Sequence, residues 1–212
     1  MSRSAFEQSR DKERRALQQI MPFLIEQSDG GLVIPVNAKN PLGLFVQKNW
    51  GDFILSAGRT LVTFEHKADA NDTNRICVEV WSNFIAGDYP SYLERGHKPG
   101  WALTSRAMIL GYHWYHSDRL ILIDLYALQQ WAFGPMHGAA TNIERHQFDG
   151  REEMAVFPYR RPLANQPNAT WVRWVPLPVL HRELKPRPIE VNVRQLYLDL
   201  GDRAPPFETF AA

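Results

Sequence analysis

The chain has 212 residues, 44% of them hydrophobic and 22% charged, with a formal net charge of +1. These values are ordinary for a soluble globular protein. The net charge does not by itself indicate a nucleic-acid binder and does not exclude one, because a local basic strip is enough to hold a phosphate backbone. The single cysteine, Cys77, excludes an intramolecular disulfide and a four-cysteine zinc site. No apolar run reaches the roughly 18 residues that span a bilayer, and the N-terminus has no signal core, so we expect a cytoplasmic protein without a membrane partner.

The first predicted element is a helix over residues 4–21, which Ser4 caps and Pro22 weakens near its end. Steps of about 100° per residue place four apolar side chains on one stripe: Phe6, Leu17, Ile20 and Leu24. Glu13 falls inside this stripe, where a carboxylate must be paired or bind a metal. Two interpretations stay open, because Glu13 either lies at the edge of the stripe beside an arginine or contributes to a site.

Residues 28–49 have the composition of a loop, with possible edge strands at 32–34 and 44–46. The clearest local pattern follows, since 52–55 and 61–65 alternate like strands and are joined by a turn. The later elements are expected in this order: a strand at 76–82, a loop at 83–100, a short helix within 101–110, strands at 111–115 and 119–124, a helix at 125–132, and a strand at 171–175. We predict one domain over 1–212, with an irregular Pro-rich tail from about residue 176.

The predicted hairpin brings two acids together. If its turn centres between Gly58 and Arg59, residues whose numbers sum to 117 face each other, so Asp52 lies opposite Glu65. Directly opposed β-carbons in a sheet are about 4.5–5.5 Å apart, and alternate side chains share a face, which places Lys67 beside Glu65. Two carboxylates and one amine therefore converge.

This grouping suits phosphodiester hydrolysis. Carboxylate oxygens are preferred ligands of Mg²⁺, which polarises a phosphoryl group and lowers the pKa of a bound water. Asp52 and Glu65 are the expected ligands, the carbonyl of His66 is a further one, and Lys67 assists the attacking water. The structural alternative is a salt-bridge cluster on a solvated sheet face. Both acids adjoin apolar strand residues, where such a cluster costs more than in a loop.

The pattern Asp52, Glu65-His66-Lys67 resembles the PD-(D/E)XK, or restriction-endonuclease-like, nuclease superfamily. Further short segments over about residues 4–178 are similar to the small phage and bacterial members. They are Asn74 with 77–83 (CVEVWSN), Gly100-Trp101, 104–107 (TSRA), Leu110, Tyr112, and 168–176 (NATWVRWVP). The resemblance implies an α/β fold with an αβββαβ core, that is, a mixed central sheet flanked by helices.

The resemblance also implies a Mg²⁺- or Mn²⁺-dependent phosphodiesterase. Many members carry an acid on the first helix near the metal, and Glu13 matches this position better than Glu7. Two positions depart from the family pattern, because Gly51 stands where proline is usual and Met108 where an aspartate is frequent.

Several weaker candidates complete the predicted site. Glu79 is either a supporting acid or a residue that points away into its own hydrogen bond. The expected nucleic-acid contacts are basic residues, for which solvated surface positions are the alternative: Lys12, Arg160, Arg161 and Arg173. His113 and His116 have a spacing compatible with metal binding, but we favour a polar pair at a strand edge.

The sequence therefore predicts a Mg²⁺- or Mn²⁺-dependent nuclease that acts on nucleic acid, on DNA in preference to RNA. Two alternatives stay open. One is a catalytically inactive module of the same fold that binds nucleic acid or a partner protein, and the other is a ribonuclease of this fold. The family resemblance also makes a homodimer an expectation.

Overall fold

The computed structural model describes residues 5–28, 32–36, 40–57, 60–85, 98–133, 157–158 and 168–193. Contacts divide the chain into two compact units, where the sequence predicts a single domain. The first unit holds Met1–Thr73, Arg106–Leu125 and Lys185–Ala212, and the second holds Asn74–Ser105 and Tyr126–Leu184. Each unit is described by itself. None of the helices in the described ranges is both long and apolar enough to cross a bilayer.

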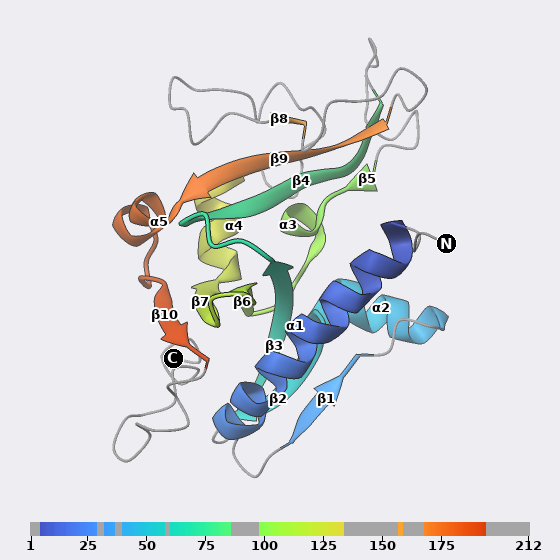
Figure 1. Cartoon of the computed structure of the whole chain (residues 1–212), viewed down its shortest axis with the longest axis vertical. Coiled ribbons are helices and arrows are strands. Elements are labelled where there is room, and N and C mark those ends of the chain that lie inside the picture. Colours follow the sequence, from blue (N-terminus) through green and yellow to red (C-terminus); the bar gives the residue numbers. More distant parts are fainter. Residues whose placement is uncertain are drawn as a thin grey trace. The chain divides into compact units, whose positions relative to one another are not determined.

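The first unit is an α/β structure around a mixed six-stranded sheet (Figure 1). Its elements are α1 (Ala5–Gln27), β1 (Val33–Pro35), α2 (Pro41–Trp50), β2 (Phe53–Ala57), β3 (Thr60–Asp69), β6 (Ile109–Trp114), β7 (Arg119–Asp124) and β10 (Ile189–Asn192). The strand order is β1-β2-β3-β6-β7-β10. Neighbouring strands are antiparallel except β3 and β6, which run parallel. The order β1-β2-β3 is a meander, and the crossover before β6 lets β3 gain a parallel neighbour.

Helix α1 supplies one side of the core of the first unit. Its apolar stripe, with Ile20, Phe23 and Leu24, packs on the sheet face that carries Phe53 and Phe64. The predicted stripe is confirmed for its described side chains. The predicted end of the helix near Pro22 is wrong, because α1 continues through Pro22 to Gln27. The burial of these residues outweighs the backbone hydrogen bond that a proline cannot donate.

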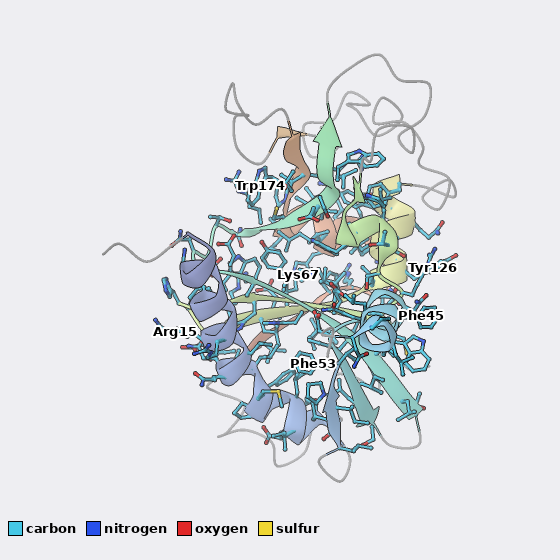
Figure 2. The ribbon with its side chains drawn as sticks, turned by 90° about the vertical axis from the view of Figure 1, so that its right-hand side faces the viewer. Arg15, Phe45, Phe53, Lys67, Tyr126 and Trp174 are labelled. Carbon is cyan, nitrogen blue, oxygen red and sulfur yellow. The ribbon has the colours of Figure 1, made fainter. Side chains whose placement is uncertain are left out.

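Helix α2 corrects the prediction of a loop with an edge strand at 44–46. Asn40 caps the helix, since its side chain accepts a hydrogen bond of 2.7 Å from the backbone N–H of Gly43, and Pro41 occupies the first turn. Both are preferred helix-start residues. Figure 2 labels Arg15 on α1 and Phe45 on α2, and the two helices lie on either side of the strands that carry Phe53 and Lys67.

The second unit contains a four-stranded antiparallel sheet of order β5-β4-β9-β8. Its elements are β4 (Arg75–Ile85), β5 (Lys98–Pro99), α3 (Trp101–Thr104), α4 (Leu125–Phe133), β8 (Phe157–Pro158), β9 (Asn168–Pro176) and α5 (Leu177–Glu183). The strands predicted at 76–82 and 171–175 lie within β4 and β9, which pair with each other. The two downstream motifs that carry the family resemblance therefore form one antiparallel ladder.

The predicted irregular tail from about residue 176 is wrong for residues 177–193, and the rest of that tail lies outside the described residues. Residues 177–193 form α5, with Leu177 and Leu180 buried, and then β10, which pairs antiparallel with β7 at the edge of the six-stranded sheet. Prolines are tolerated here because Pro178 lies in the first turn of α5 and Pro186 and Pro188 precede the strand.

Candidate active site

The hairpin register is the one that the sequence predicts. Phe53 pairs with Phe64, Leu55 with Val62 and Ala57 with Thr60, so the numbers of paired residues sum to 117. Asp52 directly precedes the first pair and Glu65 directly follows it, which places the two acids at the same end of the ladder. Since side chains alternate along a strand, Glu65 and Lys67 share the face of β3 opposite Phe64, whereas Asp52 directly precedes β2.

Two hydrogen bonds fix the Asp52 carboxylate. The backbone N–H of His66 donates to Oδ2 at 2.8 Å, and the side-chain amide of Gln47 donates to Oδ1 at 2.9 Å. The backbone N–H of Asp52 itself donates to the carbonyl of Phe64 at 2.8 Å. The Asp52 carboxylate thus takes the place of the backbone carbonyl that would otherwise accept the hydrogen bond from the N–H of His66. The side chain is tied to β3 rather than extended into solvent.

Gly51 explains the first departure from the family pattern. Its φ is +85°, and a β-carbon at this position would lie 2.6 Å from the carbonyl oxygen of Phe64. Proline holds φ near −65° and cannot adopt this conformation. Gly51 also ends α2, since its N–H donates to the carbonyl of Gln47 at 2.9 Å. The turn that aims Asp52 at β3 therefore requires glycine.

Met108 accounts for the second departure from the family pattern. Its backbone N–H donates to the carbonyl and the hydroxyl of Thr63, at 3.0 and 2.9 Å. Its side chain packs against the core on the α1 face. Met108 therefore has a packing role at the start of β6.

Glu65 and Lys67 form a close ion pair on β3. Lys67 Nζ lies 2.5 Å from Glu65 Oε1, and the exposed fractions of the two side chains are 30% and 7%. A carboxylate this deeply buried is costly unless a charged partner compensates it, and Lys67 supplies the compensation. The Lys67 side chain is thus the more exposed of the two. Figure 2 labels Lys67.

The imidazole of His66 lies on the other face of β3, the face that also carries Phe64. It is buried, and its ring centroid lies 5.8 Å from that of His113 on β6. Burial, with the neighbouring His113 and Lys67, lowers the pKa of His66 to about 3. Burial also lowers the pKa of His113 to about 4, although Asp118 acts in the opposite direction. Both rings are neutral at pH 7, and only the backbone of His66 faces the two acids.

The histidines do not form the polar pair at a strand edge that we favoured. His113 is buried in β6, whereas His116 is exposed in the turn after that strand and stacks its ring edge against Tyr115. Side chains three residues apart across this turn point to different environments. A metal site that uses both histidines has no support in this geometry.

Two of the predicted site residues belong to the second unit. Glu79 on β4 accepts a hydrogen bond of 2.5 Å from the hydroxyl of Ser82, as the alternative prediction for Glu79 proposed. Arg173 on β9 is 2% exposed, donates to the carbonyl of Ala132 and lies 5.2 Å from the ring of Phe133. A phosphate contact needs an accessible guanidinium, so we remove Arg173 from the candidate nucleic-acid contacts.

The remaining candidates are only partly within the described structure. Glu13 and Glu7 lie in α1, but their side chains are outside the described residues. Lys12 is an exposed residue of α1. Arg160 and Arg161 lie outside the described residues. The completion of the site by an acid on the first helix therefore stays a prediction.

The donor set fits a hard divalent cation through oxygen atoms. Within the described ranges, no group of three or more His, Cys, Asp or Glu side chains is arranged to hold a metal ion. The hairpin offers two carboxylates, Asp52 and Glu65, at one end of a ladder. Mg²⁺ typically binds through one or two carboxylates and keeps several waters, so two acids are enough for this ion but not for a tetrahedral zinc site.

Sequence reasoning missed Gln47. Its signal was present, because Asn40-Pro41 starts a helix and Gly51 ends it, which places Gln47 one turn before Gly51, the residue that precedes Asp52. Comparison of the chain with protein-family models, with curated proteins and with solved structures found no match in any of the three.

Proposed function

We propose that this protein is a metal-dependent nuclease that hydrolyses phosphodiester bonds, with Asp52, Glu65 and Lys67 as its central residues. The observation that carries the proposal is the juxtaposition on the hairpin. Asp52 and Glu65 share one end of the β2–β3 ladder, and Lys67 Nζ contacts Glu65 at 2.5 Å. The burial of Glu65, whose side chain is 7% exposed, argues against the alternative of a salt-bridge cluster on a solvated sheet face.

Asp52 and Glu65 are the residues that would hold Mg²⁺ or Mn²⁺, and the carbonyl of His66 is the third donor. In an extended strand, the N–H and C=O of one residue point toward the same neighbour. The N–H of His66 meets the Asp52 carboxylate, so its carbonyl opens on the same side. When bound, the cation would polarise the phosphoryl group of the substrate and lower the pKa of a bound water.

Lys67 has two tasks in this proposal. Its ammonium carries three donors on a flexible stem, so it can hold Glu65 and reach a phosphate oxygen at the same time. A positive charge there stabilises the charge that develops on the phosphate during attack by water. The greater exposure of the Lys67 side chain relative to that of Glu65 supports this role.

The finer assignment of the fold is also a proposal. The order α1, β1, β2, β3, followed by a crossover to β6 parallel to β3, is compatible with the αβββαβ core of the PD-(D/E)XK superfamily. Two features differ from the simplest form of that core, because α2 lies between β1 and β2 and the crossover carries β4, β5 and α3.

The test is a substrate panel on the purified full chain. Supercoiled plasmid, linear duplex DNA, single-stranded DNA and single-stranded RNA are incubated with Mg²⁺, Mn²⁺ or EDTA. We expect cleavage with the metals only, with DNA among the substrates. Glu65→Gln and Lys67→Met should each lower the rate by about 100-fold or more. Glu26→Gln, at an exposed position of α1, serves as the matched control and should cleave like the wild type.

One observation favours a second candidate, the inactive module that binds nucleic acid or a partner. Each acid has a partner within the protein, since Asp52 accepts hydrogen bonds from Gln47 and His66 and Glu65 pairs with Lys67. In that case the wild type leaves all four substrates intact in both metals. Gel-shift binding without cleavage, unchanged by Glu65→Gln, would favour the module over the enzyme. Cleavage of RNA alone would favour the ribonuclease.

A further inference from the structure

The Asp52 carboxylate has one donor that no motif predicts. We propose that Gln47 is a positioning residue, which orients Asp52 for the metal, and this proposal rests on the proposed nuclease function. Gln47 Nε2 lies 2.9 Å from Asp52 Oδ1, and this contact joins α2 to the residue that opens the hairpin. Gln47 touches no reacting group in this arrangement. It acts only through Asp52.

The chemistry of the contact fixes its direction. An ionised carboxylate only accepts hydrogen bonds, so the Gln47 amide must present its NH₂ group to Asp52. The backbone N–H of His66 occupies the other oxygen, Oδ2, at 2.8 Å. With one donor on each oxygen, the plane of the carboxylate is held at both ends. Each oxygen can accept more than one partner, so a cation can bind without displacing either donor.

The helix end holds Gln47 itself in place. The carbonyl of Gln47 accepts the N–H of Gly51 at 2.9 Å, and Gly51 directly precedes Asp52. The positive φ of Gly51 then reverses the chain so that the Gln47 side chain and the Asp52 side chain meet. The helix, the glycine and the aspartate thus form one short unit. The backbone of this unit holds the Gln47 amide in position before any cation binds, so cation binding does not have to order the amide.

Loss of this donor should weaken metal binding more than it lowers the stability of the fold. Partners that orient metal ligands typically change metal affinity or activity by about 10- to 100-fold when they are removed. Gln47→Met keeps the length and helix propensity of the side chain but removes its NH₂ group. We expect a dissociation constant for Mn²⁺ at least about tenfold higher, with a cleavage rate that recovers as the Mn²⁺ concentration is raised.

A second substitution separates positioning from packing. Gln47→Glu keeps the shape of the side chain, but the new carboxyl group donates a hydrogen bond only when it is protonated. The like charge of Asp52 raises the pKa of that new group. The cleavage rate relative to the wild type should therefore rise as the pH is lowered from about 8 to about 6. The same ratio for Gln47→Met should stay flat.

The experiment titrates the full chain with Mn²⁺ alone, followed by electron paramagnetic resonance, and measures DNA cleavage on the same samples. Asn49→Ala is the control, since Asn49 lies on the same helix and, among the described residues, its side chain donates to the carbonyl of Phe45 in its own turn. It should bind Mn²⁺ and cleave like the wild type. Thermal unfolding of each variant verifies that the chain is folded.

The outcomes distinguish the two proposals. If the wild type neither binds Mn²⁺ nor cleaves, both proposals are overturned. If the wild type does both and Glu65→Gln abolishes cleavage, the nuclease stands. In that background, a Gln47→Met protein with an unchanged Mn²⁺ dissociation constant and rate overturns the role of Gln47 alone. The same pH profile for Gln47→Glu and Gln47→Met would also overturn it.

Discussion

The ring of Phe64 on β3 occupies the space above the backbone of Gly111 on β6. A β-carbon built on Gly111 would lie 2.1 Å from Cζ of Phe64. Phe64 is fully buried and directly precedes Glu65, so the close approach of the two strands determines where the candidate site lies over the sheet. The parallel pair β3–β6 thus depends on the absence of a side chain at one position.

Gly111→Ala should destabilise the first unit. Phe64 packs against Phe53 with ring centroids 6.4 Å apart and has no exposed surface into which to move. Overpacking of a core costs about 1–3 kcal/mol, and we expect a loss in this range from urea unfolding. Gly43→Ala on α2 is the matched substitution and should cause no loss, because alanine is favoured over glycine within a helix. Equal stability of the two variants would contradict the packing described here.

Gly51→Ala should affect both stability and cleavage. The residue has φ of +85°, and the added carbon would meet the carbonyl oxygen of Phe64 at 2.6 Å. Backbone strain of this kind costs on the order of 1–3 kcal/mol. Relief of the strain moves Asp52 away from β3, so the cleavage rate should fall further than the loss of folded protein explains. Circular dichroism and the plasmid assay on one preparation measure both effects.

The buried histidines predict a loss of stability in acid. The pKa values of His66 and His113 are lowered to about 3 and about 4 from 6.5, so the unfolded chain binds more protons between these values. Their contribution is fully present above pH 6.5 and is lost as the pH falls toward 4. The loss is on the order of 2 kcal/mol per histidine between about pH 7 and about pH 5.

A substitution assigns that acid sensitivity. His113→Phe keeps a ring in the core and removes one titrating group, so the free energy of unfolding should depend less steeply on pH. Exposed His116 provides the control, and His116→Phe should follow the profile of the wild type. Urea titrations in buffer with EDTA exclude any contribution from bound metal. An unchanged slope for His113→Phe would show that this ring is not neutral in the folded state.

Arg119 should stabilise the edge of the six-stranded sheet. Its guanidinium contacts Asp72 at 3.0 Å and Glu190 on β10 at 2.5 Å, and it lies 5.2 Å from the ring of Trp114. Arg119→Ala should lower the free energy of unfolding by roughly 1–2 kcal/mol, less in high salt, because the cluster is partly exposed. Arg182 contacts its neighbour Glu183 at 2.7 Å through a side chain that is 62% exposed, and Arg182→Ala should change stability by less than about 0.5 kcal/mol.

Local alternation was enough to predict the hairpin and its register. The period of two in 52–55 and 61–65 and the turn between them leave one pairing that keeps Phe53, Leu55, Val62 and Phe64 on the core face. The positions of the strands β6 and β7 and of the helix α4 were likewise predicted from local sequence patterns, to within a few residues. The positions of Asp52 and Glu65 relative to each other follow from this local pattern.

Contacts between distant segments could not be predicted in the same way. Nothing in the composition of 185–193 indicates that it joins β7, because the prolines suggest an irregular chain and the pairing partner lies about 70 residues earlier. Arg173 was expected on the surface because charged side chains are usually exposed. The sequence does not indicate the buried contacts that Arg173 makes with Ala132 and Phe133. Gln47 was missed because the glycines and prolines near it are typical of a loop. In the structure, Pro41 and Gly51 instead lie at the two ends of the helix α2.

The first unit is assembled from three separate stretches of chain, and its last strand, β10, comes after all the helices and strands of the second unit. On the ribosome, the second unit is complete while the first still lacks an edge. The six-stranded sheet that contains β2 and β3 therefore gains its edge strand β10 only after residues more than a hundred positions downstream have been synthesised. A nascent chain stalled before residue 189 would therefore carry the acids of the hairpin on a sheet that lacks β10.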